Sequence, residues 1–141
     1  MPGTFRVLLP DNAPFTDHVS PGMTYELPFE RPGQQDWRLW DFRCDVRIKT
    51  EAADSDADPL FSLNSDDDEI TVDQTDDEIA AAGDQWQLIT LRMSSAKTLL
   101  LVELEVYKFD VWAFLKTDPD IRTVAFPYSE LFCLERVTHV A

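Results

Sequence analysis

The segment Phe42-Arg-Cys-Asp-Val-Arg-Ile-Lys49 alternates apolar and charged residues without a break. Successive side chains of a β-strand point to opposite faces, so this pattern puts four apolar side chains on one face and four charged ones on the other. A strand with one buried and one solvent-exposed face is typical of an antiparallel sheet. The segment therefore predicts a half-buried strand in an antiparallel β-sheet.

Further strands are predicted on both sides of this one. They cover residues 4–9, 23–29, 59–63, 69–74, 85–93, 105–116, 121–127 and 129–140. A short helix is predicted at residues 95–100, because the Ser94 hydroxyl can accept the free N–H groups of its first turn. Thr117-Asp-Pro-Asp120 is predicted to be a hairpin turn. The fold class is therefore all-β: an antiparallel β-sandwich of seven to nine short strands with at most one short helix.

The length of 141 residues predicts a single folded domain. We expect the β-sandwich domain to span residues 23–141. Residues 1–22 are rich in proline and are expected to form an N-terminal extended arm or a first strand. No apolar run is long enough for a membrane span, and the first residues do not have the pattern of a secretory signal peptide.

The chain is strongly acidic, with 27 Asp and Glu residues against 12 Lys and Arg residues and a net charge of −15. Without clustered basic residues, neither direct nucleic-acid binding nor binding to an anionic membrane is expected. The acidic residues gather between Lys49 and Arg92, where no basic residue occurs. They form either solvated loops that keep the protein soluble or a contact surface for a basic partner or a cation.

No set of residues in the sequence predicts catalysis. His18 and His139 lie near opposite ends without a cysteine nearby, and four glycines in the whole chain leave no phosphate-binding loop. We therefore expect no enzymatic activity, no cofactor and no small-molecule ligand. Cys44 and Cys133 lie in apolar segments and are expected to be buried free thiols, which can pair only if their strands face each other.

One acidic loop partly matches a calcium-binding pattern. Asp54-Ser-Asp-Ala-Asp58 has the first ligand spacings of an EF-hand loop, but Pro59 replaces the required glycine and Ser65 the required glutamate. No metal site is therefore predicted. The residues that remain as candidates for a looser cation site are Asp66, Asp67, Asp68, Asp76 and Asp77.

Several aromatic residues are candidates for protein contacts. If Phe109 and Val111 point inward on their strand, Trp112 and Phe114 point outward. They then form either a second buried face or an apolar patch that another subunit covers, and the same alternatives apply to Trp37 and Trp40. Because large aromatic residues dominate interface energetics, the candidate interface residues are Trp37, Trp40, Trp112 and Phe114.

The order of the motifs resembles that of a known family. Gln87-Leu-Ile-Thr-Leu-Arg-Met-Ser-Ser-Ala-Lys-Thr98, Tyr107-Lys-Phe-Asp-Val111 and Thr117-Asp-Pro-Asp120 carry most of the resemblance, which covers residues 23–140. They resemble small Ig-like β-sandwich virion proteins of tailed bacteriophages and are similar to the N-terminal domain of phage upper-baseplate proteins. Ile121 stands where the turn of that family has glycine. The resemblance implies an Ig-like sandwich.

The resemblance also implies a function. The chain is expected to be a non-enzymatic structural component of a tailed-bacteriophage virion, at the tail, baseplate, neck or capsid surface. It would be made in the host cytoplasm and would contact other virion proteins and copies of itself. One alternative is a carbohydrate- or cation-binding attachment module on the same fold. Another is an acidic decoy that inhibits a basic host protein. The net charge of −15 is consistent with this alternative.

Overall fold

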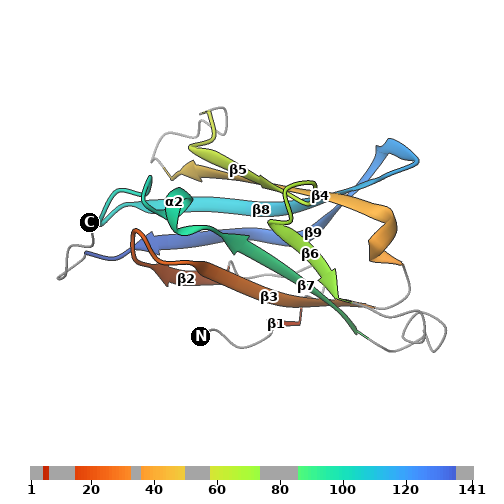
Figure 1. Ribbon diagram of the computed structural model, residues 1–141, viewed down its shortest axis with the longest axis horizontal. Helices are drawn as coiled ribbons and strands as arrows, with labels where there is room; N and C mark the ends of the chain where they lie inside the picture. The colour runs from red at the N-terminus through yellow and green to blue at the C-terminus, as the bar shows by residue number, and fades with distance from the viewer. Residues whose placement is uncertain (1–4, 7–14, 33–35, 50–57, 74–85, 136–141) are drawn as a thin grey trace.

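The computed structural model describes residues 5–6, 15–32, 36–49, 58–73 and 86–135, which form two β-sheets packed face to face (Figure 1). The described elements are β1 (Phe5–Arg6), β2 (Phe15–Val19), β3 (Tyr25–Pro32), η1 (Trp37–Leu39), β4 (Trp40–Ile48), β5 (Phe61–Asn64), β6 (Ile70–Asp73), β7 (Trp86–Met93), α2 (Ser95–Thr98), β8 (Val106–Leu115) and β9 (Asp118–Cys133). The predicted all-β sandwich with at most one short α-helix is confirmed in the described residues.

The strand order is that of an immunoglobulin-like sandwich. One sheet has the order β1-β3-β7-β6 and the other the order β2-β9-β8-β4-β5. These orders correspond to the A-B-E-D and G-F-C-C′ sheets of immunoglobulin domains, with β2 as an additional edge strand beside β9. Two of the four edge pairs, β1–β3 and β2–β9, are parallel, so the antiparallel arrangement expected from the sequence holds for the other pairs and not for these two. Neither pair is joined by a hairpin, and therefore nothing in its connection requires an antiparallel direction.

An aromatic cluster joins the two sheets in the core. Phe126 of β9 lies 4.8 Å from Phe29 of β3 and 6.5 Å from Phe109 of β8, measured between ring centroids. Phe15 of β2 packs edge-on against Phe126 at 5.6 Å. Apart from Phe15, which is partly buried, these rings are nearly inaccessible to solvent. The ring of Phe126 thus contacts aromatic rings from both sheets.

The connection from β7 to β8 is built around a cap and a buried tyrosine. The Ser94 hydroxyl accepts the Lys97 N–H at 3.3 Å, which confirms its predicted role as the N-cap. The helix is shorter than expected and ends at Thr98. Downstream, the Tyr107 hydroxyl accepts the Val102 N–H at 2.8 Å. A tyrosine at the start of this strand that bonds to upstream backbone is also a feature of immunoglobulin-like domains.

The hairpin between β8 and β9 differs from the prediction. Leu115 pairs with Asp118, so the turn consists of Lys116 and Thr117 and not of residues 117–120. The preceding pair is Phe114 with Arg122, which leaves residues 119–121 as a bulge on β9. Proline has no N–H for a sheet ladder, and a bulge is a place that tolerates it. The two strands predicted at 121–127 and 129–140 therefore form one strand over their described part.

Both cysteines are buried free thiols, as predicted. Cys44 lies on β4 and Cys133 on β9, and β8 lies between these strands in the sheet. Complete burial raises the pKa of the Cys44 thiol well above its usual value. A neutral buried thiol is a poor nucleophile, so Cys44 serves packing and not chemistry.

Candidate functional site

The four aromatic candidates do not lie together. Trp37 in η1 is only 2% exposed, and its ring centroid is 5.6 Å from that of Trp40 and 6.1 Å from that of Phe42. The guanidinium of Arg31 lies over the Trp37 ring at 5.4 Å, and the backbone N–H of Trp37 donates to the side-chain oxygen of Gln87 at 3.2 Å. Trp37 is therefore part of the chain's own core, and no partner can cover it. Trp40 is partly buried against the same core.

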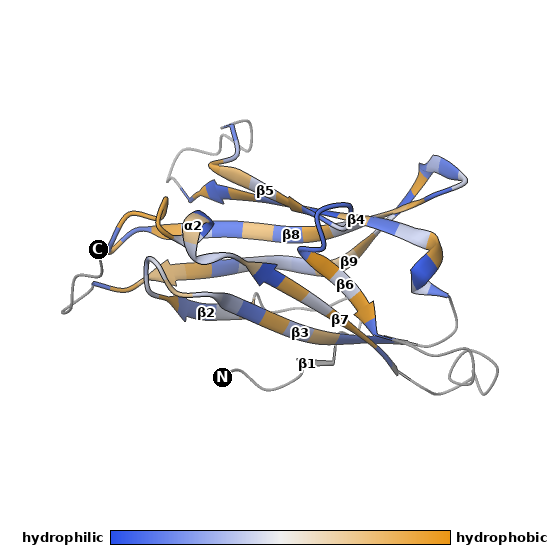
Figure 2. Ribbon diagram, viewed as in Figure 1, coloured by the Kyte–Doolittle hydropathy of each residue, from blue (hydrophilic) through white to orange (hydrophobic). Residues whose placement is uncertain are grey.

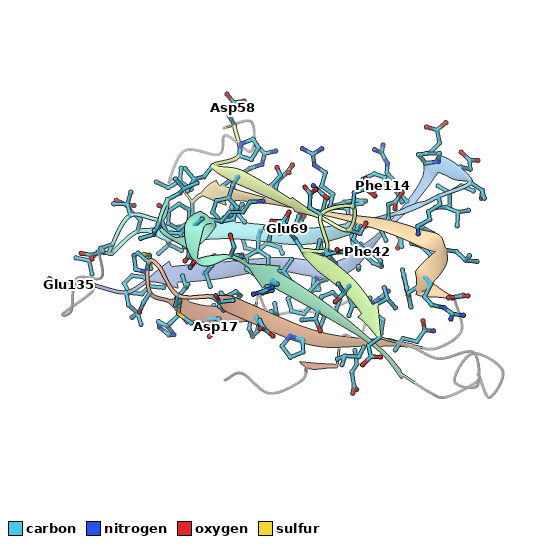
Figure 3. All side chains as sticks on the ribbon, viewed as in Figure 1. Asp17, Phe42, Asp58, Glu69, Phe114 and Glu135 are labelled. Carbon is cyan, nitrogen blue, oxygen red and sulfur yellow. The ribbon has the colours of Figure 1, made fainter. Side chains whose placement is uncertain are left out.

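Trp112 and Phe114 do point outward from β8. Val111, which precedes Trp112, and Ala113, which lies between the two aromatic residues, are fully buried. The predicted alternation is therefore confirmed. In Figure 3 the side chain of Phe42 points toward the other sheet, whereas Phe114 points away from it. Across the sheet Trp112 pairs with Arg43 of β4, and Phe114 pairs with Asp41. The outer face of the five-stranded sheet thus places aromatic rings beside charged side chains.

This outer face is far less acidic than the rest of the chain. Its described basic residues are Arg43, Arg47, Lys49, Lys108 and Arg122, and its acidic residues are Asp41, Asp45, Asp110 and Glu130. Five positive against four negative charges give a formal charge of +1, whereas the whole chain carries −15. Among the side chains that the structure describes, the outer face of the other sheet has Glu26, Glu30 and Asp73 against Arg92, and Arg6 of β1 lies opposite Glu30 in the register. The charge is therefore distributed unevenly between the two faces.

Ion pairs hold this face in a defined arrangement. Asp45 accepts hydrogen bonds from Arg43 Nε at 3.0 Å, from Arg47 at 3.2 Å and from the Ser62 hydroxyl at 2.6 Å. Burial acts to raise the pKa of Asp45, but these hydrogen bonds and the two positive charges outweigh it, and the pKa lies below its usual value. Asp45 is therefore ionised at neutral pH and holds both arginines on the outer face through these ion pairs.

An open depression of about 390 Å³ lies in the centre of the face, lined by Asp45, Arg47, Lys108, Phe109, Asp110, Trp112 and Tyr128. At one side the Trp112 indole N–H donates to an Asp110 oxygen at 3.2 Å. Burial raises the pKa of Asp110, and the negative charge of Asp45 adds to this, although Trp112 and Arg47 act in the opposite direction. The depression combines aromatic walls with fixed charges of both signs, which suits a protein side chain or a polar ligand.

Replacing Asp110 with asparagine is expected to stabilise the fold at pH 7 by about 0.5–1 kcal/mol. The raised pKa means that the ionised carboxylate opposes folding at neutral pH. This penalty is lost as the pH falls through the folded pKa, and it is absent below the pKa of the unfolded chain. The gain should therefore vanish near pH 3, as measured by urea unfolding at both pH values. Asp41→Asn on the same face is the control for net charge, and equal gains in both variants would contradict the role of burial.

Three of the acidic candidates for a cation site, Asp66, Asp67 and Asp68, lie in the described part of the chain. Asp66, Asp67 and Asp68 are exposed in the loop between β5 and β6, where Asp67 bonds to Asn64 through both its N–H and its carboxylate. Asp76 and Asp77 lie outside the described residues. Within the described part of the chain, no group of three or more His, Cys, Asp or Glu side chains is placed to hold a metal ion.

The sequence reasoning missed the basic residues around the aromatic ones. Arg43 and Arg47 were recognised only as residues on the solvent-exposed face of a strand, and Lys108 was not singled out. The signal that would have found them is the pairing of two alternating strands, since Arg47 lies directly opposite Lys108. Like charges in adjacent positions disfavour pairing unless neighbours compensate. The grouping of Arg43, Arg47 and Lys108 can thus be recognised only once the register between β4 and β8 is known.

No described helix is long and apolar enough to cross a membrane. The chain matches no protein-family model, and no curated protein is significantly similar to it.

Proposed function

We propose that this chain is a non-enzymatic structural component of a tailed-bacteriophage virion, and that it assembles through the outer face of its five-stranded sheet. The phage setting rests on the order of the sequence motifs described above. The observation that carries the proposed mode of action is a near-neutral face with Trp112 and Phe114 on a chain whose net charge is −15. Aromatic residues and arginine are the residue types enriched in protein interfaces.

A second copy of the chain is the partner that this face suits best. Two chains of charge −15 repel each other over most of their surfaces, and the repulsion is weakest where the local charge is close to zero. Positive and negative residues alternate along β4 in the order Arg43, Asp45, Arg47, and β8 continues the pattern with Lys108 and Asp110. A copy related by a two-fold axis can therefore place opposite charges against each other, with Trp112 as the anchor.

Arg43→Glu is expected to weaken self-association of the purified chain by about tenfold or more, because it replaces a pairing charge beside Trp112. Sedimentation velocity over a range of concentrations measures this. Arg92→Glu makes the same change of charge on an exposed strand position of the other sheet and should leave the association unchanged. The wild-type oligomer is expected to survive high salt, because close apolar packing around Trp112 is not screened.

Two results would contradict this partner. One is a wild-type chain that stays monomeric at every concentration. The other is an equal loss of association in Arg43→Glu and Arg92→Glu, which would show that total charge alone controls it.

The central depression favours carbohydrate binding as a second candidate function. Trp112 and Tyr128 provide rings for stacking on a sugar, and Asp110 and Lys108 provide polar groups beside them. Glycan binding by a chain that remains monomeric, lost in Trp112→Ala, would support this function over self-assembly. An evenly acidic decoy surface fits less well, because this face carries a formal charge of +1.

A further inference from the structure

A second exposed surface lies at the end of the sandwich where α2 leads into β8. Leu99, Leu100, Val102 and Leu104 are exposed by 53, 51, 58 and 61%. Figure 2 shows this connection as a predominantly hydrophobic stretch at the end of the molecule where the chain also reaches its last described residues. Four aliphatic side chains at or above half exposure within six residues are unusual for a free loop.

Two neighbours extend this surface. The Thr98 hydroxyl donates to the Met23 carbonyl at 2.6 Å, and the Leu104 N–H donates to the carbonyl of Cys133 at 2.7 Å, next to Leu134. The side chains of Met23 and Leu134 are themselves exposed. We call the surface formed by Met23, Leu99, Leu100, Val102, Leu104 and Leu134 the apolar corner.

The apolar corner is rigidly held. Leu101 in its middle is buried in the core, and Val102 is fixed by its hydrogen bond to Tyr107. Leu104 has a φ of 70°, in the left-handed region that a side chain with a Cβ disfavours. The surrounding hydrogen bonds thus keep a leucine in a disfavoured conformation that displays it to solvent. Display of apolar groups on a preorganised backbone lowers the entropic cost of binding a partner.

We infer that the apolar corner docks into a different protein, one that presents an apolar socket with a basic rim. The acidic residue Glu105 follows the exposed leucines, and Glu135 follows Leu134 at the same end of the molecule (Figure 3). Residues 98–106 contain no lysine or arginine. A rim of opposite charge on the partner would pair with these carboxylates while the leucines fill the socket.

A second copy of this chain fits the corner poorly. A two-fold contact there would bring Glu105 close to the same residue of the other copy, and like charges that lie close together repel each other. The corner also shares no residue with the sheet face proposed for self-assembly. The two inferences are therefore independent, and each can fail without the other.

The test uses a labelled amphipathic helical peptide of leucine and lysine as a surrogate for the socket, with fluorescence anisotropy as the readout. Leu100→Asn combined with Leu104→Asn is expected to reduce peptide affinity about tenfold or more in high salt. Leu39→Asn combined with Ile121→Asn is the matched control, because these two residues are similarly exposed at 57 and 48% but lie at the opposite end of the sandwich. All three proteins carry the same charge. A leucine–glutamate peptide of the same pattern should not bind.

Equal peptide affinity for all three proteins would overturn the inference, since binding would then follow net charge alone. Self-association of the wild-type chain that is lost in the corner variant would overturn the assigned partner and replace it with a second copy. Loss of binding in the corner variant alone, with unchanged sedimentation, supports a socket on another protein.

Discussion

Phe126→Ala is expected to cost about 3–5 kcal/mol of unfolding free energy, because it removes a large ring from a core that cannot collapse around the space. Phe126 is 3% exposed and contacts Phe29 in one sheet and Phe109 in its own. The cavity would therefore open between the sheets, where backbone pairing within each sheet prevents them from moving closer. Many small domains have a total stability of this order, so we expect the variant to be largely unfolded.

Urea unfolding followed by tryptophan fluorescence and by circular dichroism measures the effect. Tyr128→Ala two positions along β9 is the control, because Tyr128 is 44% exposed on the outer face. It should cost less than about 1 kcal/mol. Similar losses in the two variants would contradict the assignment of Phe126 as the residue that joins the sheets.

Trp37→Ala is expected to be similarly damaging, at about 3–5 kcal/mol. Its ring packs between Trp40, Phe42 and the guanidinium of Arg31, and η1 is fixed by the Asp36 side chain, which accepts the Arg38 N–H at 3.1 Å. Removing the ring leaves both a cavity and a buried arginine without its aromatic partner. Thermal and urea unfolding of the purified variant measure the loss.

The comparison with Trp112→Ala separates a core role from an interface role. Trp112 is partly exposed, so its replacement should cost about 1 kcal/mol of stability or less while weakening self-association. Trp37→Ala should show the reverse, a large loss of stability without a specific loss of association in the fraction that folds. A stable Trp37→Ala variant that no longer associates would show that the burial of Trp37 does not define its role.

Local alternation predicted most strands, because it reports directly on which face of a strand is buried. In β4 the inward residues Phe42, Cys44 and Val46 are buried as expected, and only Ile48 at the end of the strand is exposed. Ser94 was recognised because an N-cap depends on neighbouring residues alone. By contrast, the Asp-Pro dipeptide at 118–119 suggested a turn, although the structure uses it in a bulge. Turn-forming residues suit both places equally well.

Properties that depend on distant residues were not predictable in this way. The parallel pairing of β2 with β9 joins Phe15 to Ser129, and no local pattern carries that information. For the same reason the sequence did not separate the buried Trp37 from the outward Trp112. The sequence did not single out the apolar corner, because a run of leucines before a strand is equally compatible with burial. Its exposure follows from the tertiary position of Leu101 and Tyr107, which fix the loop.

The pairing of β2 with β9 has a consequence for how the protein is made. Residues 15–19 can reach their place beside residues 129–133 only after all the residues between these two strands have been synthesised. Closing such a long loop is slow, and until then the edge of β2 remains unpaired. We therefore expect a nascent chain to expose this edge on the ribosome, where the acidic net charge of −15 would keep neighbouring chains apart until the last strand arrives.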